Sequence, residues 1–312
     1  MDGGSEGRGS APIGRDPRRG YALAVLTMVI SGVSIYVNSL GVRMFSDSTL
    51  YTALKNAVVG VALILPLAFS RPARQAYRRL RRGEWTLLLL VSLIGGSVPY
   101  ALYFRGLQLS TPVTASLIDH TQFLFVALLA ALFLKERFRI TVWAALVVLL
   151  VGLTLGISVR AVRLDPGVPL LWTATLLFAA DFVVMKHLLR SVDALTVMTF
   201  KMTLGSVLLF AFVAATGHAA MVPALSARQL AFVGVTGLIL LAFTISSILG
   251  LRHASATAVT AIPAGSPIVT TALVVIAQHT EIPAWRLFGL LLALLAVLVI
   301  FLLGRYQERR TA

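Results

Sequence analysis

The chain alternates long apolar runs with short connections in which arginine, glycine and proline are frequent. A helix needs about 20 apolar residues to cross a hydrocarbon core about 30 Å thick. Runs of that length predict ten transmembrane helices, at residues 21–41, 47–69, 86–106, 112–134, 140–158, 168–189, 193–215, 228–250, 255–278 and 285–304. The connections are short, so we expect consecutive helices to be antiparallel neighbours. The pattern therefore predicts an all-α membrane protein with no soluble domain between its spans.

Composition supports this class. Of the 312 residues, 58% are hydrophobic and 12% are charged, and the mean hydropathy is +0.90. Soluble domains average about 25% charged residues. The sequence has no cysteine, which excludes disulfides, zinc–thiolate sites and thiol catalysis. The net charge of +15 would suggest nucleic acid in a soluble protein. Here the basic residues lie in loops between spans, so we expect no nucleic-acid partner.

The distribution of basic residues predicts the orientation. With the N-terminus inside, 19 lysines and arginines fall on the cytoplasmic side, six on the other side and two within spans. This bias follows the positive-inside rule, and it predicts a multi-pass membrane protein with both termini cytoplasmic; we expect it in the inner membrane of a prokaryote. Residues 1–20 should form a disordered cytoplasmic tail rather than a cleavable signal peptide, and residues 305–312 a second tail. The six arginines of residues 71–82 are expected to anchor the chain at the headgroups of membrane lipids, and binding of one specific lipid is the less favoured alternative.

A nearly constant offset indicates an internal duplication. Identical residues recur 145 or 146 positions apart, as in Asp47/Asp193, Lys55/Lys201, Ser110/Ser255 and Glu136/Glu281. The offset divides the chain into repeats at 21–158 and 168–304. Each repeat has five spans, an odd number, so the two copies must cross the membrane in opposite directions. The fold predicted is thus ten transmembrane helices in two inverted-topology five-helix repeats, a plan used by secondary transporters.

Two matching stretches carry a family resemblance. STPVTASLIDHTQFLFVALLAALFLKERF (110–138) and SATAVTAIPAGSPIVTTALVVIAQHTEIP (255–283) are similar to the fourth and ninth helices of the EamA family, within the drug/metabolite transporter superfamily. The resemblance extends over about residues 21–304. It implies secondary-active transport, often export, of a small metabolite such as an amino acid or a related polar organic compound. In one departure, Gln122 stands where the second copy has Pro267, and Asp119 and His120 precede it, which suggests specialisation.

Five ionisable residues lie well inside the spans: Lys55, Asp119, His120, Asp181 and Lys201. Such residues are usually paired, face the interior and are functional. At about 1.5 Å of rise per residue, each lies roughly 10–12 Å from one end of its helix. We therefore expect two pairs, Lys55 with Asp119/His120 and Asp181 with Lys201, that act in gating or substrate binding. Structural pairing and snorkelling of the lysines stay as alternatives. His120 beside Asp119 raises proton coupling as a further expectation, with a hydrogen-bonded core histidine as its alternative.

Helix-breaking and polar residues predict a cavity. The segment AIPAGSPIV places two prolines and a glycine in mid-span, which frees backbone carbonyls that need protein or water beside them. A simple kink is the alternative. The expected cavity-lining residues are Asn38, Gln122, Trp172, Pro263, Gly265, Ser266 and Pro267, although Trp172 also fits an interfacial anchor. Glu136 and Glu281 are expected to be structural caps or braces of their loops.

Motifs for nucleotide binding, zinc proteolysis and serine hydrolysis are missing from the sequence. We therefore expect no catalytic residues, no bound metal and no cofactor. An integral-membrane enzyme acting on a lipid-linked substrate, with Asp119 and His120 as its polar site, is the alternative function. The identity of the cargo, its direction of movement and the oligomeric state stay open at this level.

Overall fold

The structure is a computed structural model, which describes residues 16–41, 44–45, 47–69, 75, 77–78, 80–110, 112–136, 139–156, 165–217, 225–279 and 281–311. The described residues of the first half form α1 (Pro17–Gly41), α2 (Ser48–Phe69), α4 (Arg82–Gly96), α5 (Val98–Gln108), α6 (Pro112–His120), α7 (Gln122–Phe133) and α8 (Ile140–Leu155). The second half forms α9 (Val168–Leu188), α10 (Ala194–Ala215), α11 (Ala227–His253), α12 (Ala256–Ala261), the 3₁₀ turn η4 (Pro263–Gly265), α13 (Ser266–Gln278) and α14 (Ala284–Thr311).

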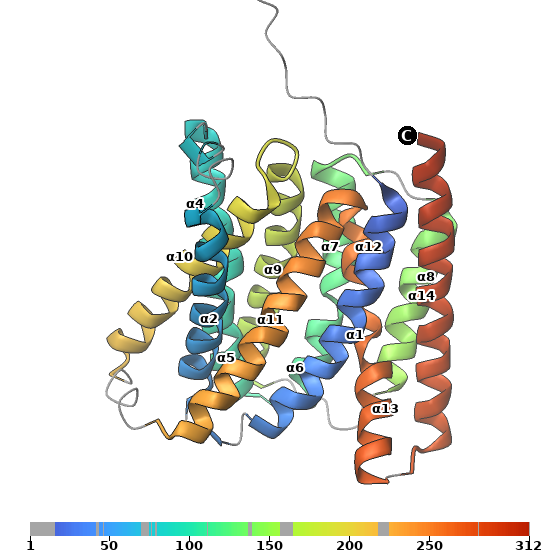
Figure 1. Ribbon diagram of the computed structural model, residues 1–312. Helices are drawn as coiled ribbons and strands as arrows, with labels where there is room; N and C mark the ends of the chain where they lie inside the picture. Colours follow the sequence, from blue (N-terminus) through green and yellow to red (C-terminus); the bar gives the residue numbers. More distant parts are fainter. Residues whose placement is uncertain are drawn as a thin grey trace, which may run out of the picture.

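These elements make ten passes through one bundle (Figure 1). Three passes are interrupted, because α4–α5, α6–α7 and α12–η4–α13 each continue in one direction. In the described part of the chain, nine passes are long and apolar enough to cross a membrane, and the tenth, α8, is a shorter apolar helix. The predicted all-α membrane fold is confirmed.

The two halves run in opposite directions. In Figure 1 α1 leads away from the end of the bundle at which α14 finishes, whereas α9, which opens the second half, leads toward that end. Equivalent aspartates begin the second helix of each half: the carboxylate of Asp47 accepts from the Thr49 backbone N–H at 2.6 Å, and that of Asp193 accepts from Thr196 N–H at 3.0 Å. Such caps satisfy donors that a helix start leaves free. The inverted five-helix repeat is thus visible in direction and in local chemistry.

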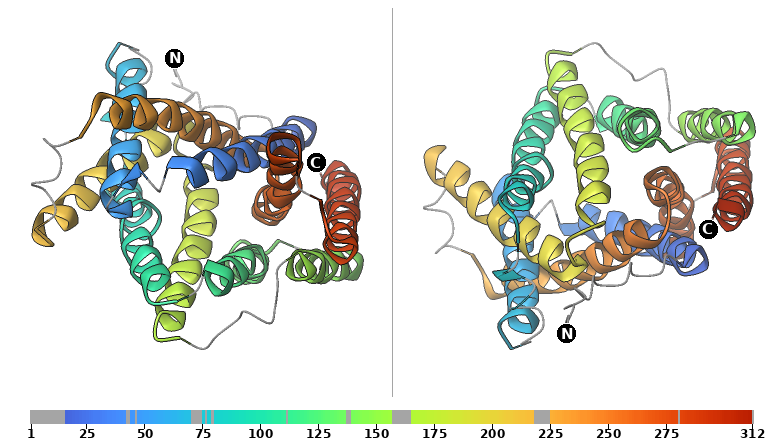
Figure 2. Two further views of the ribbon diagram at one scale, coloured as in Figure 1. Left: turned by 90° about the horizontal axis from the view of Figure 1, so that it is seen from below. Right: turned by 90° about the horizontal axis from the view of Figure 1, so that it is seen from above.

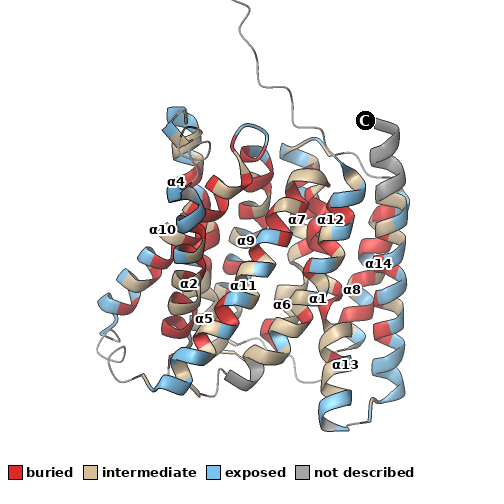
Figure 3. Cartoon of the chain, in the orientation of Figure 1, coloured by how far each residue is buried: buried red, intermediate tan, exposed pale blue. Residues whose placement is uncertain are grey.

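Small residues let equivalent helices of the two halves pack closely. The α8–α14 pair forms one side of the bundle, and α2 packs along α10 (Figure 2). A Cβ added to Gly152 of α8 would lie 2.7 Å from the carbonyl oxygen of Gly289 on α14. A Cβ on Gly60 of α2 would lie 3.2 Å from Thr203 of α10. Close approach of this kind favours association of helices in lipid. Buried residues accordingly line the inter-helix faces, and exposed residues lie outside (Figure 3).

Three boundaries differ from the sequence prediction. Helix α1 begins at Pro17, inside the expected tail 1–20, and α14 continues to Thr311 through the expected tail 305–312. Residues 1–15 lie outside the described residues. The span predicted at 86–106 is broken at Ser97, which has φ −141° and ψ −68°. Pro99 follows, and it lacks the N–H that a continuous helix would use.

Candidate functional site

A cavity of about 290 Å³ lies where two interrupted passes meet the centre of the bundle. Its walls come from α1, α6 and α7 of the first half and from α9, α11, α12, η4 and α13 of the second. The lining residues are Thr27, Ser31, Ile35, Asp119, His120, Gln122, Phe123, Phe182, Phe243, Ser247, Val259, Thr260, Pro263, Ala264 and Ser266. A cavity between inverted repeats, beside discontinuous helices, is where transporters of this plan hold their substrate.

The breaks beside the cavity have local causes. Helix α6 ends at His120, and the Thr121 N–H donates to the Ile118 carbonyl at 3.0 Å, which tightens the turn before α7. In the second half the Gly265 N–H donates to the Ile262 carbonyl at 3.0 Å in the 3₁₀ turn. The two breaks fall at equivalent positions of the repeats, about 145 residues apart. Asp119 and His120 therefore stand at the last turn of a half-helix, next to the cavity.

The structure brings together only part of the predicted cavity lining. Gln122, Pro263 and Ser266 line the cavity, whereas Asn38, Trp172, Gly265 and Pro267 do not belong to its wall. Trp172 is 37% exposed, and its ring packs edge-on against the Phe125 ring with 5.6 Å between the ring centres. Gly265 is buried against α1, where an added Cβ would lie 3.0 Å from the Met28 sulfur. Pro267 lies in the first turn of α13. Asn38 lies one helical turn beyond the lining residue Ile35.

Lys201 of α10 forms a buried ion pair with Asp181 of α9, as the sequence predicts. Asp181 is 1% exposed and Lys201 is 8% exposed. A Cβ on Gly95 of α4 would overlap the Asp181 carboxylate, so the glycine makes room for it. The Lys201 ammonium also lies 6.0 Å from the centre of the Phe182 ring, and this ring lines the cavity. The ion pair is therefore separated from the cavity by one aromatic side chain.

Lys55 has a different partner from the one predicted. Its ammonium donates to Asn38 Oδ1 at 3.0 Å and lies 4.4 Å from the centre of the Tyr51 ring, whose hydroxyl donates to the same Asn38 oxygen at 2.6 Å. The predicted pairing of Lys55 with Asp119 or His120 is wrong. In each half, the lysine of the second helix bonds a residue of the first helix. Lys55 bonds Asn38 of α1, and Lys201 pairs with Asp181 of α9. Position 38 corresponds to 184, one turn from Asp181.

Sequence reasoning missed a second buried lysine. Lys186 counts among the 19 basic residues predicted on the cytoplasmic side, at the end of the span 168–189, yet it is 6% exposed and donates to the carbonyl oxygens of Leu251, at 2.5 Å, and Ala254. These carbonyls end α11, where helix acceptors need partners. Beside them Glu136 Oε1 accepts from the Ala256 N–H at 3.0 Å, which fits its expected role as a cap. No pattern in the sequence distinguishes Lys186 from a loop lysine, because its partners are backbone groups 65 and 68 residues away.

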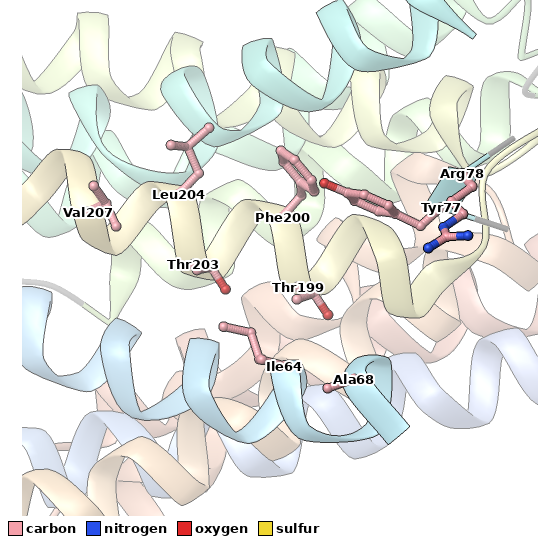
Figure 4. A pocket seen from close by; sticks show the side chains of 9 residues that line it. All are labelled: Ile64, Ala68, Tyr77, Arg78, Thr199, Phe200, Thr203, Leu204 and Val207. Carbon is pink, nitrogen blue, oxygen red and sulfur yellow. The ribbon is translucent and has the colours of Figure 1, made fainter. Parts of the chain in front are cut away.

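A larger hollow of about 530 Å³ lies between α2 and α10 (Figure 4). Its lining includes Ile64, Thr199, Thr203 and Val207, with Arg78 at one end. Ile64 is 39% and Val207 56% exposed, so the hollow opens to the outside of the bundle. It faces the surroundings rather than a path between the halves, and the smaller central cavity is the candidate site.

Comparisons with known proteins agree with this architecture. A crystal structure matches with a TM-score of 0.75 over 93% of this chain and 98% of that chain, at 20% sequence identity, which shows the shared fold. An uncharacterized transporter of Methanothermobacter thermautotrophicus is 28% identical over 137 residues, which is 42% of this chain. That match spans 40% of the relative's own length. The model of the EamA-like transporter family matches residues 18–157 and again residues 165–302. The chain is therefore a multi-pass membrane protein that belongs to the EamA-like transporter family.

Proposed function

We propose that this transporter moves a small polar organic solute, such as an amino acid or a related metabolite, by secondary-active alternating access. The observation that carries the proposal is the central cavity, because both inverted halves build it and half-helix ends border it. Its volume of about 290 Å³ is near the lower end of the roughly 300–1,000 Å³ typical of small-molecule sites. A metabolite of modest size fits this space.

The Asp181–Lys201 pair supports a gating role in this proposal. It joins α9 to α10 within the second half, and Phe182 connects it to the cavity wall. Rearrangement of α9 against α10 would move the pair and the ring together. A polar pair that forms in one conformation and separates in the other needs a differential stability of only a few kcal/mol to bias two states strongly. In the first half, the Lys55–Asn38 bond occupies the equivalent helix pair and is the matching element of the opposite gate.

The direction and the membrane belong to the same proposal. The bias of 19 to six basic residues supports both termini in the cytoplasm, and we place the protein in the inner membrane of a prokaryote. Export is the direction that the family resemblance favours. His120 and Asp119 both line the cavity, which supports proton coupling because a group exposed to alternate sides can carry a proton.

Reconstitution in liposomes tests the function. Purified protein should accelerate counterflow of a labelled amino acid into vesicles preloaded with the same unlabelled compound, and the label should be recovered chemically unchanged. Liposomes without protein serve as the control, and the Asp119→Asn variant, which alters the cavity wall, should move less label. Chemical conversion of the solute without any movement would instead support the membrane enzyme. An imposed pH gradient that leaves solute movement unaffected would remove proton coupling from the proposal.

A further inference from the structure

Asp119 is a carboxylate without a counter-ion at the wall of the central cavity. Among the described residues it takes part in no hydrogen bond or ion pair. The three lysines within the described helices are engaged elsewhere, Lys201 with Asp181, Lys55 with Asn38 and Lys186 with two backbone carbonyls. Asp119 and His120 are successive residues of one helix, so their side chains leave the helix axis about 100° apart. An uncompensated charge inside a membrane protein is costly and usually functional.

Helix α5 contacts α6 and carries one cation, Arg105, in its last turn, but among the described residues no ion pair joins Arg105 to Asp119. The same helix carries Tyr100 and Tyr103. Tyr103 packs against the buried cluster of Ala115, Ile118 and Leu171, and Ile118 directly precedes Asp119. Phenol groups are neutral at physiological pH. The carboxylate therefore lines the cavity without an ion pair to α5 among the described residues.

The cavity wall favours a cation over an anion. Its lining holds one carboxylate and one imidazole but no lysine or arginine. Three rings, those of Phe123, Phe182 and Phe243, belong to the wall, and aromatic faces attract cations. The lining also includes five residues with hydroxyl side chains, Thr27, Ser31, Ser247, Thr260 and Ser266. An ammonium donates three hydrogen bonds and accepts none, so carboxylate and hydroxyl oxygens are suitable partners.

We propose that the transported solute carries an ammonium group, which binds the Asp119 carboxylate in the central cavity. The inference rests on the proposed transport function and specifies its substrate class: small amines and amino acids, rather than carboxylic acids, phosphorylated compounds or neutral polyols. The single carboxylate fixes the ammonium end, and the phenyl rings and hydroxyls accommodate the rest. An anionic solute would lose its hydration beside Asp119 and gain no cationic partner in the wall.

The test uses four-carbon solutes of similar size and different charge. Binding of 1-butylamine, 4-aminobutanoate, 1-butanol and butanoate to the purified full-length protein is measured by calorimetry, and their counterflow is measured in liposomes. The two ammonium compounds should bind and move, and Asp119→Asn should weaken their binding at least about tenfold, as expected for loss of a charge-assisted hydrogen bond. Asp165→Asn is the matched control, since the Asp165 carboxylate accepts from Ser110 away from the cavity.

A second measurement needs no variant. A hydrophobic carbodiimide should modify Asp119 in the unaltered protein, as located by mass spectrometry, and 1-butylamine should slow that modification while butanoate should not. Preferential binding of butanol or butanoate, or equal protection by amine and acid, overturns the ammonium proposal and leaves the transport function in place. Amine binding with Asp119 protection but without counterflow of any solute supports the ammonium site and overturns the transport function.

Discussion

Replacing Lys201 by methionine removes the only counter-ion that the described residues provide for the Asp181 carboxylate. Asp181 is 1% exposed, and its second oxygen, Oδ1, already lacks a hydrogen-bond partner. Methionine keeps much of the length and apolar volume of the lysine stem, so the substitution changes charge more than packing. The carboxylate is then left buried and unpaired.

The expected cost follows from how buried ion pairs respond to loss of one partner. Removing one member typically destabilises a protein by about 3–5 kcal/mol, whereas replacing both members is often close to neutral. We therefore expect Lys201→Met alone to lower the free energy of unfolding by about 3 kcal/mol or more. Combining it with Asp181→Asn should recover about 2 kcal/mol of that loss, because no uncompensated charge remains.

Unfolding in mixed micelles, followed by tryptophan fluorescence, measures these differences. Lys55→Met is the matched control, because Lys55 occupies the equivalent position of the first half but bonds Asn38, an amide that keeps its bond from Tyr51. Its loss leaves no unpaired carboxylate and should be clearly less destabilising. Equal destabilisation by the two lysine variants, or a double variant that loses the sum of both single losses, would refute the reasoning. If the pair also acts in gating, the double variant should recover stability without recovering transport.

Three further predictions follow from other contacts. Gly95→Ala places a methyl group against the Asp181 carboxylate and should destabilise the fold by about 1–3 kcal/mol. The control Gly83→Ala, which has nothing within 4 Å of the added Cβ, should not destabilise it, and equal melting temperatures of the two variants would contradict the close approach. Lys186→Met leaves the Leu251 and Ala254 carbonyls without that donor and should lower the free energy of unfolding by about 1–3 kcal/mol in the same assay. The control Arg82→Met, at an exposed residue, should lower it little, and equal stability of the two variants would show that Lys186 has no structural role. Single cysteines introduced at Gln75 and Ala284 test the orientation, because the sequence has no cysteine of its own. An impermeant thiol reagent outside the cell should label position 284 and not position 75, and the reverse pattern would show that the predicted orientation is wrong.

Much of the fold is predictable from the sequence because one strong physical constraint acts locally. Each apolar run has to satisfy its own backbone hydrogen bonds in lipid, so run length alone predicts a transmembrane helix. The repeat offset and the odd number of spans per half then require inversion. The mid-span break at Pro263 is also local, because proline lacks an N–H wherever it stands. The Lys201–Asp181 pair was predictable from the matching depth of the two residues in the membrane, because opposite charges in a low-dielectric interior stabilise each other.

Matching depth in the membrane did not predict the partner of Lys55. Asn38 carries no charge and gives no signal of depth matching, and only the packing of α1 against the second helix shows that its oxygen lies 3.0 Å from the ammonium. Because Lys55 bonds Asn38, it is not the partner of Asp119, and Asp119 is left without a counter-ion among the described residues. The sequence around Lys55 or Asp119 alone does not reveal this.

Only the tertiary structure shows which polar residues near the ends of spans are buried and which line the cavity. Lys186 follows an apolar run and resembles a loop charge in sequence, but the end of α11 covers it and supplies two carbonyl acceptors. Equally, Asn38 and Trp172 are polar or aromatic residues in spans, yet Asn38 bonds Lys55 one turn beyond the cavity and Trp172 packs against Phe125, so neither belongs to the cavity wall. The sequence determines which segments cross the membrane and in which direction, because that depends on each segment's own hydrophobicity and charge. Which side chains meet depends on helix rotation and crossing, which are set by packing between segments far apart in the chain.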